Sequence, residues 1–422
     1  MTSQVTICGG GNAAHTLAGI LGSHTNLVVQ VYAPYSDEAA KWQEGIQSRG
    51  GIAVDTPSGM MVGRPERVSA EAAAVVPGSR MIILALPAFA HESTLADIAP
   101  HLDPGAWVGA MPARGGFDLG AHRALANQAL HVTLFGFQTL PWACRIQTYG
   151  QEALVLGTKE QVDIAAWPAE QAPLVAKEFE YLLGVPTNPA SGFLSLTLAD
   201  VGQIIHPGIM YGLFHKWDGS PYSRPPLFYQ GVDSETTAVL QEMSAEIQGL
   251  REFFEVQFSG FDLSAVHTLE EWLRRSYQLA IADDSTLLAC FHTNRSYAGL
   301  TAPVQQTANG FIPDFSARYL SEDVPFGLLV TRGIAEIAGV STPTIDQVLY
   351  WAQDRLNQKY LVDGHLNPAA LQSTRTPQRF GLTYLEQLLD VKPIRQWSSL
   401  SRTQCSASNT NQQPWEEITD ES

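Results

Sequence analysis

Two kinds of hydrophobic pattern divide the chain. In the first 190 residues, short apolar runs rich in β-branched residues alternate with amphipathic stretches of helical length. Residues 4–8 form the first run, residues 12–21 the first helical stretch, and the run at 27–32 completes a β-α-β unit. Further strands are predicted at 81–86, 107–111, 132–137 and 153–156, with helices such as 91–98 and 121–130 between them. This alternation predicts an α/β Rossmann fold, a doubly wound parallel sheet.

From about Gly192 onward the strand-like runs give way to helical periodicity. Helices are predicted at 194–216, 234–258, 268–279, 327–338, 344–358 and 382–389. We therefore expect a dinucleotide-binding Rossmann domain over residues 1–190 and a mostly α-helical second domain over 191–398, which holds the catalytic and substrate-binding groups. The segment 399–422 is polar and has few apolar groups to offset its ordering entropy, so it is predicted to be a disordered acidic tail.

Composition narrows the classes of partner. A chain of 422 residues corresponds to two or three domains, and two fit the patterns above. Its 25 Lys and Arg against 42 Asp and Glu give a net charge of −17, which argues against binding to nucleic acid or to anionic membranes. Cys8, Cys144, Cys290 and Cys405 lie too far apart to indicate a disulfide framework or a zinc site, so no metal is expected. No signal peptide or long apolar stretch is evident, which predicts a cytoplasmic protein.

A glycine-rich turn joins the first strand to the first helix. Gly9-x-Gly11-x-x-Ala14 stands in the context that the dinucleotide fingerprint requires. Gly9 permits the tight turn, Gly11 lets the backbone approach a pyrophosphate, and Ala14 allows close contact between helix and strand. The acidic residue expected near position 32 is absent; Asp37 and Glu38 come slightly later, and no arginine stands where a 2′-phosphate would bind. NAD is therefore favoured over NADP.

Two later strands end in residues that could reach the cofactor crevice. Pro87 follows one of them and is expected to line the nicotinamide side, although a buried strand ending in a proline turn fits the local sequence equally well. Arg114 follows another strand beside two glycines, at the edge where such sheets bind anions. A solvated arginine is the alternative for Arg114.

The helical half contains a polar stripe in an apolar segment. Asp200, Gln203 and His206 recur every three residues and are expected to share one face of a helix that Pro207 bends. Because imidazole titrates near neutrality, His206 is the best candidate for a general acid or base. Asp323 could orient His206, and Arg318 could hold an anion; a salt-bridged loop is the plainer interpretation of the segment around them.

With these residues in place, the chain resembles the opine dehydrogenase family, in its animal, octopine dehydrogenase-like branch. The resemblance rests on ordered segments between about residues 4 and 390: CGGGNAAHTLAGI, LPAFAHE, TLPWACRI, LGTK, IHPGIMYG, KWDG, NRSYAGL, APVQQ, PDFSARYLSEDVP, KYLVDG and TPQRFGL. It implies a Rossmann domain followed by a helical domain, and NADH-dependent reductive condensation of a 2-oxo acid, usually pyruvate, with the amino group of an amino acid. The enzyme would work as a monomer or weak homo-oligomer.

The resemblance also implies roles for single residues. His206 would be the catalytic acid/base with Asp323 as its partner, and Arg318 would anchor the cofactor pyrophosphate across the cleft. Gly9, Gly11 and Asn12 would form the cofactor turn, while Thr139 and Cys144 would line the substrate pocket. Gln203 is expected to bind substrate as well, because of its place on the polar stripe.

Arg114 departs from the neutral polar side chain expected there, and Asp200 and Gly202 replace larger residues. A cation at position 114 suits the carboxylate or sulfonate of a small donor such as alanine, glycine, taurine or β-alanine, in preference to arginine. Two other functions stay open: a 2-hydroxy acid dehydrogenase of the same architecture, and a non-catalytic NADH-binding sensor.

Overall fold

The main sheet has eight strands, and six of them run parallel. In the computed structural model, which describes residues 2–126 and 131–389, the parallel strands are β5 (Arg67–Ser69), β2 (Leu27–Tyr32), β1 (Ser3–Cys8), β6 (Ser79–Leu84), β7 (Trp107–Ala110) and β8 (Thr133–Phe137). At the far edge β11 (Val162–Trp167) runs antiparallel to β8, and β12 (Thr187–Pro189) runs parallel to β11. The predicted tail, 399–422, lies outside the described residues.

Both faces of this sheet are covered. Val5 and Ile7 of β1 pack into one apolar core, together with α1 (Asn12–Leu21) and α6 (Ala172–Leu183). Cys8 faces the opposite core, with α3 (Ala72–Val75), α4 (His91–Ile98) and α5 (Phe117–Leu125). Successive side chains of a strand point to opposite faces, so the unbroken apolar runs reflect burial on both sides. The doubly wound fold predicted from the sequence is confirmed.

A second, four-stranded sheet was not predicted. It has the order β4 (Gly59–Gly63), β3 (Ile52–Thr56), β10 (Glu152–Thr158) and β9 (Trp142–Thr148), with α2 (Glu38–Arg49) preceding it in the chain. The apolar run 153–156 was assigned to the main sheet, and this assignment was wrong because β10 pairs with β3 and β9. Ala153 and Val155 are buried, whereas Leu156 is 60% exposed, so the run is a strand with one covered face.

The junction between sheet and helices is a short helix, α7 (Phe193–Ala199), that packs on both sides. Phe193 and Leu196 belong to the core of the sheet, while Leu194 and Leu198 belong to the core of the helices. The single helix predicted over 194–216 was wrong: the backbone is extended at Asp200, and α8 (Gly202–Phe214) starts anew. The Asp200 carboxylate accepts a hydrogen bond from the Gly202 amide at 3.0 Å, which stabilises this break.

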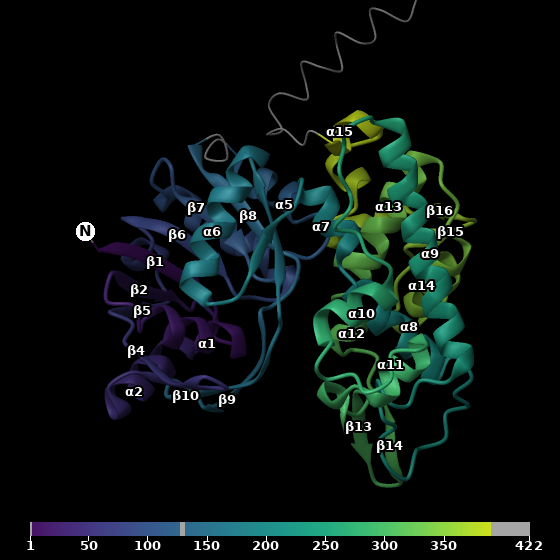
Figure 1. Ribbon diagram of the computed structural model, residues 1–422, viewed down its shortest axis with the longest axis horizontal. Helices are drawn as coiled ribbons and strands as arrows, with labels where there is room; N and C mark the ends of the chain where they lie inside the picture. Colours follow the sequence, from purple (N-terminus) through teal and green to yellow (C-terminus); the bar gives the residue numbers. More distant parts are fainter. Residues whose placement is uncertain (1, 127–130, 390–422) are drawn as a thin grey trace, which may run out of the picture.

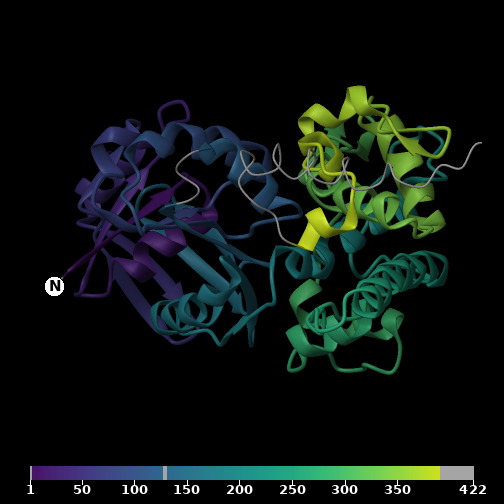
Figure 2. The same ribbon diagram turned by 90° about the horizontal axis from the view of Figure 1, so that it is seen from above.

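The second lobe is mostly helical and lies beside the sheet lobe in both ribbon views (Figures 1 and 2). Its helices besides α8 are α9 (Ser234–Gln257), α10 (Leu269–Tyr277), α11 (Leu287–Thr293), α12 (Arg318–Ser321), α13 (Leu329–Ala338), α14 (Pro343–Arg355) and α15 (Leu385–Leu389). A π-helical turn, Val324–Leu328, precedes α13, and two hairpins complete the lobe: β13 (Val304–Thr307) with β14 (Gly310–Pro313), and β15 (Leu361–Val362) with β16 (His365–Leu366).

Helix α8 is held tightly within this lobe. Gly208 and Gly212 face Leu240 and Thr236 of α9 so closely that an added Cβ would collide with them. Asp233 caps α9 by accepting a hydrogen bond from the Thr236 amide at 2.8 Å. The close crossing fixes α8, and therefore the direction in which its side chains point. In the described ranges, no helix has the length and apolar character needed to cross a membrane.

Candidate active site

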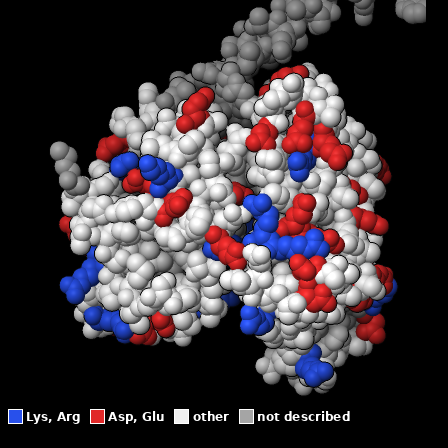
Figure 3. Space-filling view, in the orientation of Figure 1, with Lys and Arg blue, Asp and Glu red and all other residues white. Residues whose placement is uncertain are grey.

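A cavity of about 650 Å³ lies between the two lobes. The sheet lobe contributes the glycine turn after β1, the segments that follow β6 and β7, part of β9, and Lys159, which follows β10; the helical lobe contributes residues of α8, α10 and α12. In the space-filling view, Lys and Arg side chains gather in the middle of the face, over the junction of the lobes, with Asp and Glu beside them (Figure 3). Elements of both lobes therefore build one site, at the carboxyl ends of the parallel strands where such folds bind ligands.

The glycine turn forms one end of the cavity. Gly9 has φ +132°, and a Cβ there would lie 2.6 Å from the Ala85 carbonyl oxygen, so only glycine fits. A Cβ on Gly11 would meet no protein atom within 4 Å, which leaves that side of the turn open to a ligand. Gly11 precedes the first turn of α1, whose amides point toward this space, and Ala14 is fully buried behind it.

Asn12 has a structural contact that the sequence did not indicate. Its side-chain oxygen accepts a hydrogen bond from the Ile146 amide at 2.8 Å, which ties the turn to β9.

Glu38 is the acidic residue that the fingerprint lacked at its usual position. Its carboxyl group lies against Gly10, where a Cβ would come within 2.5 Å of it, and it lines the cavity. Burial raises the pKa of Glu38, and one of its oxygens has no hydrogen-bond partner among the described residues. Asp37, by contrast, pairs with Lys41 at 2.9 Å on the surface. Glu38 therefore presents a free acceptor beside the turn, as a ribose-binding carboxylate must.

The middle of the cavity is lined by the segments that follow β6, β7 and β8. Pro87, Thr139 and Cys144 are all lining residues, as expected, and burial raises the pKa of the Cys144 thiol. Lys159, which was not predicted as a site residue, also lines the cavity and donates to the Leu140 carbonyl oxygen at 2.9 Å. Burial lowers the pKa of its ammonium group to about 8.

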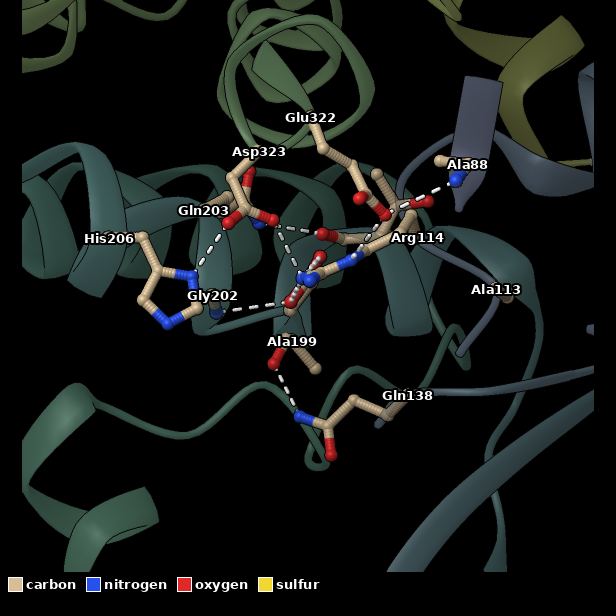
Figure 4. Close-up of polar contacts among 12 residues, drawn as sticks. Ala88, Ala113, Arg114, Gln138, Ala199, Gly202, Gln203, His206, Glu322 and Asp323 are labelled. Carbon is tan, nitrogen blue, oxygen red and sulfur yellow. Dashed lines mark hydrogen bonds and ion pairs between the residues drawn. The ribbon is translucent and has the colours of Figure 1, made fainter. Parts of the chain in front are cut away.

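His206 and Asp323 meet in the helical lobe, although 116 residues separate them in the sequence (Figure 4). His206 Nδ1 lies 2.6 Å from Asp323 Oδ2. An ionised carboxylate only accepts hydrogen bonds, so Nδ1 carries the proton and Nε2 is left to act on the cavity side. Asp323 is 2% exposed, and it immediately precedes the π-helical turn, an irregularity often found at functional sites.

Two tyrosines complete the surroundings of the imidazole. Tyr229 Oη lies 3.2 Å from Nε2, and the Tyr319 ring stacks on the imidazole with centroids 4.3 Å apart. Tyr229 is held in turn by stacking on Tyr297 at 4.0 Å. Tyr229, in a connecting segment, and Tyr319, in the short helix α12, were not predicted as site residues, because nothing in the local sequence distinguishes them from aromatic residues of the core.

Arg114 crosses from the sheet lobe into a group of three carboxylates (Figure 4). Its Nη1 lies 2.9 Å from Asp323 Oδ1 and 3.3 Å from Asp200 Oδ1, and its Nε lies 3.7 Å from Glu322 Oε1. Burial alone would lower the pKa of the guanidinium, but the charges of Asp323, Asp200 and Glu322 raise it above its ordinary value. The cation that was predicted to hold a substrate anion is thus already paired within the protein.

Arg318 and Gln203 lie differently. Arg318 lines the cavity, its side chain is 60% exposed, and its Nε pairs with Glu322. Gln203 is fully buried and does not line the cavity: its amide donates to the Thr197 carbonyl oxygen at 2.8 Å and accepts from the Thr331 hydroxyl at 2.6 Å. The break at Asp200 turns Gln203 into the lobe, so the polar stripe expected on one continuous helix does not exist.

The chain was compared with known proteins. Residues 189–356 match the family model of the α-helical domain of NAD/NADP octopine/nopaline dehydrogenases. Tauropine dehydrogenase of Arabella iricolor is 38% identical over 394 residues, which cover 91% of this chain and 99% of that protein. The chain belongs to the opine dehydrogenase family. This confirms the resemblance and the prediction of an oxidoreductase.

Solved structures of octopine dehydrogenase agree with this assignment. The complex with NADH and L-arginine has a TM-score of 0.84 at 34% identity, and the complex with NADH and pyruvate has a TM-score of 0.82 at 32% identity. Both cover 93% of this chain and 98% of the solved chain. The similarity therefore extends over both lobes of the opine dehydrogenase fold.

Proposed function

We propose that the protein is an NADH-dependent opine dehydrogenase that joins pyruvate to the amino group of a small amino acid and yields an N-(1-carboxyethyl)amino acid. One observation carries the proposal: an aspartate-bound imidazole and an open glycine turn face the same cavity. The relatives support it, since tauropine dehydrogenase and the octopine dehydrogenase complexes with NADH, arginine and pyruvate are similar over almost the whole chain.

The residues at the glycine end fit a dinucleotide. Gly11 and the first amides of α1 would hold the pyrophosphate, and the free oxygen of Glu38 would accept from ribose hydroxyls, an arrangement that favours NAD over NADP because a 2′-phosphate would be repelled. Arg318, exposed at the other lobe, would reach the pyrophosphate across the cleft, and Pro87 would line the nicotinamide side. The bound cofactor would supply the hydride that reduces the substrate imine.

His206 handles the proton of the reaction. Pyruvate and the amine lose water to form a C=N bond; reduction places a hydride on carbon, and nitrogen must gain a proton for the secondary amine to form. The imidazolium of His206 donates that proton from Nε2 and takes it back in the reverse direction. Asp323 stabilises the imidazolium and fixes the ring through Nδ1, as a carboxylate does in a hydrolase triad. Tyr229 Oη lies beside Nε2 and holds the same nitrogen before substrate arrives.

The charges around the cavity indicate the class of amino donor. Of the four cations in the cavity lining, Arg114 and Arg318 are already paired with carboxylates of the protein, which leaves Arg145 and Lys159 without an ion pair among the described residues. The described lining contains two carboxylates, Glu38 and Asp200. Glu38 belongs to the glycine turn, and Asp200 is engaged by Arg114 and the Gly202 amide. A guanidinium side chain on the donor would meet no free carboxylate. Donors with one amine and one anionic group, such as taurine, alanine, glycine or β-alanine, are therefore preferred over arginine.

The test is NADH oxidation with pyruvate and a panel of taurine, alanine, glycine, β-alanine and arginine. We expect at least one small donor to support turnover with a kcat/KM above that of arginine. Turnover with arginine alone would contradict the donor class but not the reaction. Equal rates with and without any amine would contradict the reaction and indicate a 2-hydroxy acid dehydrogenase, and no turnover with any donor would indicate a non-catalytic NADH-binding protein.

A further inference from the structure

Arg114 is built into the molecule in an unusual way. It follows β7 with φ +63°, a left-handed conformation that costs energy for a residue with a side chain, and Gly115 and Gly116 come next. Its side chain is 15% exposed and points out of the sheet lobe toward carboxylates that all belong to the helical lobe. Strain of this kind persists only where surrounding contacts impose it. Here the ion pairs of the side chain act together with hydrogen bonds to the backbone of Ala113 and Gly116 on either side.

The cluster has an unequal number of charges. Asp200, Glu322 and Asp323 are 2–6% exposed; among the described residues their arginine ion-pair partners are Arg114 and Arg318, and the buried Arg375 also acts on Glu322. With a neutral imidazole the five ion-paired groups sum to one negative charge, which Arg375 offsets at Glu322. Burial and repulsion from Asp323 raise the pKa of Asp200, while Arg114 lowers it, so the carboxylates compete for the same cation. The number of charges in the cluster therefore acts on the proton of His206.

We infer that Arg114 is a positioning residue for the His206–Asp323 pair: it holds Asp323 from the opposite lobe and sets the pH at which the imidazole titrates. Arg114 binds one oxygen of Asp323 while His206 binds the other. Without the guanidinium, Asp323 would favour the imidazolium more strongly, and the histidine would be a poorer base. This role deepens the proposed function, on which its catalytic meaning rests, and replaces the predicted role of Arg114 in binding the donor's anion.

The contact between Arg114 and Asp323 also joins the lobe that would bind the dinucleotide to the lobe that carries the proton-transferring histidine. The glycine turn belongs to the sheet lobe, whereas His206 and Asp323 belong to the helical lobe. Arg114 lies at the end of β7, two strands from β1, and spans the gap. Glu322 adds a second link, because it accepts from the Ala88 amide of the sheet lobe at 3.2 Å. Arg114 thus connects the group that moves the proton with the lobe that binds the dinucleotide.

The His206 ring has a defined set of charged and titratable neighbours. Asp323, Tyr229 and Tyr319 contact it. Beyond them lie Arg114, Asp200, Glu322 and Arg318, with Arg145 of β9 near Tyr319. Arg375 acts on Glu322, and the buried His91 lies within reach of the charges of Arg114, Arg318 and Arg375. Substitutions at Arg114 and Asp200 remove opposite charges from this set without touching the ring. They are therefore expected to move the titration of His206 in opposite directions.

The experiment is an NMR titration of enzyme labelled with 15N-histidine, with the His206 signal assigned as the one lost in His206→Gln. Arg114→Gln should move the titration midpoint upward by about one pH unit, and Asp200→Asn should move it downward by about half a unit. Arg114→Lys keeps the positive charge, so its titration midpoint should stay near that of the wild type. Its kcat/KM should fall about tenfold, because a single ammonium group cannot make the contacts of the guanidinium. Arg332→Gln is the control: Arg332 is also buried and paired, with Glu336 and Asp346, but does not line the cavity.

An unchanged or downward midpoint in Arg114→Gln, or an upward one in Asp200→Asn, would overturn the inference. A shift of equal size in Arg332→Gln would also overturn it, since loss of any buried arginine would then suffice. If Arg114→Gln fails to fold, Asp200→Asn and Arg114→Lys still decide the outcome. The titration needs no turnover, so its result is separate from that of the donor panel: missing amine-dependent activity would contradict the proposed function alone.

Discussion

The two ends of the cavity are assembled in different ways. At the glycine end, one contiguous segment from Gly9 to Asn12 supplies the turn, and Glu38 joins it from the segment after β2. The catalytic end is assembled from separate segments of both lobes, which supply Arg114, Asp200, His206, Tyr229 and Asp323. A local site depends on backbone conformation, which the sequence of the turn specifies. A site of distant residues depends on packing between elements, and each contact there is a tertiary one.

The largest expected effect comes from the catalytic end. His206→Ala removes the proton donor, and we expect kcat to fall by about a thousandfold or more while NADH binding is retained, because general acid–base catalysis contributes roughly 10²–10⁴. Steady-state kinetics and NADH fluorescence titration measure the two quantities. His215→Ala is a matched control: this histidine follows the same helix and is 18% exposed, against 19% for His206, but it does not line the cavity. Near-normal activity in His206→Ala would contradict the assignment.

At the glycine end, alanine substitutions of Gly9 and Gly11 should have opposite effects: the first should lower stability, and the second should weaken NADH binding. Gly9→Ala forces a Cβ against the Ala85 carbonyl oxygen at φ +132°, so the free energy of unfolding should fall by about 3 kcal/mol or more. Gly11→Ala meets no protein atom and should leave stability unchanged, but its methyl group should weaken NADH binding by about tenfold or more, roughly 1.4 kcal/mol. Urea unfolding and NADH titration of both variants provide the measurement.

The reverse outcome would contradict this account of the turn. If Gly11→Ala lost stability and kept its affinity for NADH, the open side of the turn would not be the pyrophosphate site.

A smaller effect is expected from Lys159, between the two ends. Because its pKa is lowered to about 8, the ammonium loses its charge as the pH rises through that value in the ligand-free enzyme. A bound anion favours the charged form, so affinity for an anionic substrate should be full below about pH 8 and decline several-fold above it. The KM for pyruvate between pH 6.5 and 9.5 measures this. Lys159→Met should remove the dependence, whereas Lys216→Met, at an exposed lysine paired with Glu235, should retain it.

The contrast between a local turn and a site assembled from distant segments also explains which features could be predicted from the sequence. The main sheet and the turn follow local rules, and α1 spans Asn12–Leu21, the residues predicted for it. The local hairpin of β3 and β4 was missed. The run 153–156 was placed in the wrong sheet, because the pairing of β10 with the distant β3 leaves no local pattern. Periodicity assigned Gln203 to the site, but the break at Asp200 turned it away.

Resemblance and chemistry singled out His206 and Asp323, but only coordinates show that they touch. The partners of Arg114 could not be predicted, since a buried and a solvated arginine look alike in sequence. The positioning role proposed for Arg114 rests on its distances to Asp200, Glu322 and Asp323.

The central claim is that the cavity makes a secondary amine from pyruvate and an amino acid. The most direct test is mass spectrometry of the products formed from pyruvate, NADH and the best donor of the panel, with NADH consumption followed in the same reaction. We expect one N-(1-carboxyethyl)amino acid to form for each NADH consumed, and no product when the amine is left out. Lactate formed at the same rate with or without the amine would contradict it.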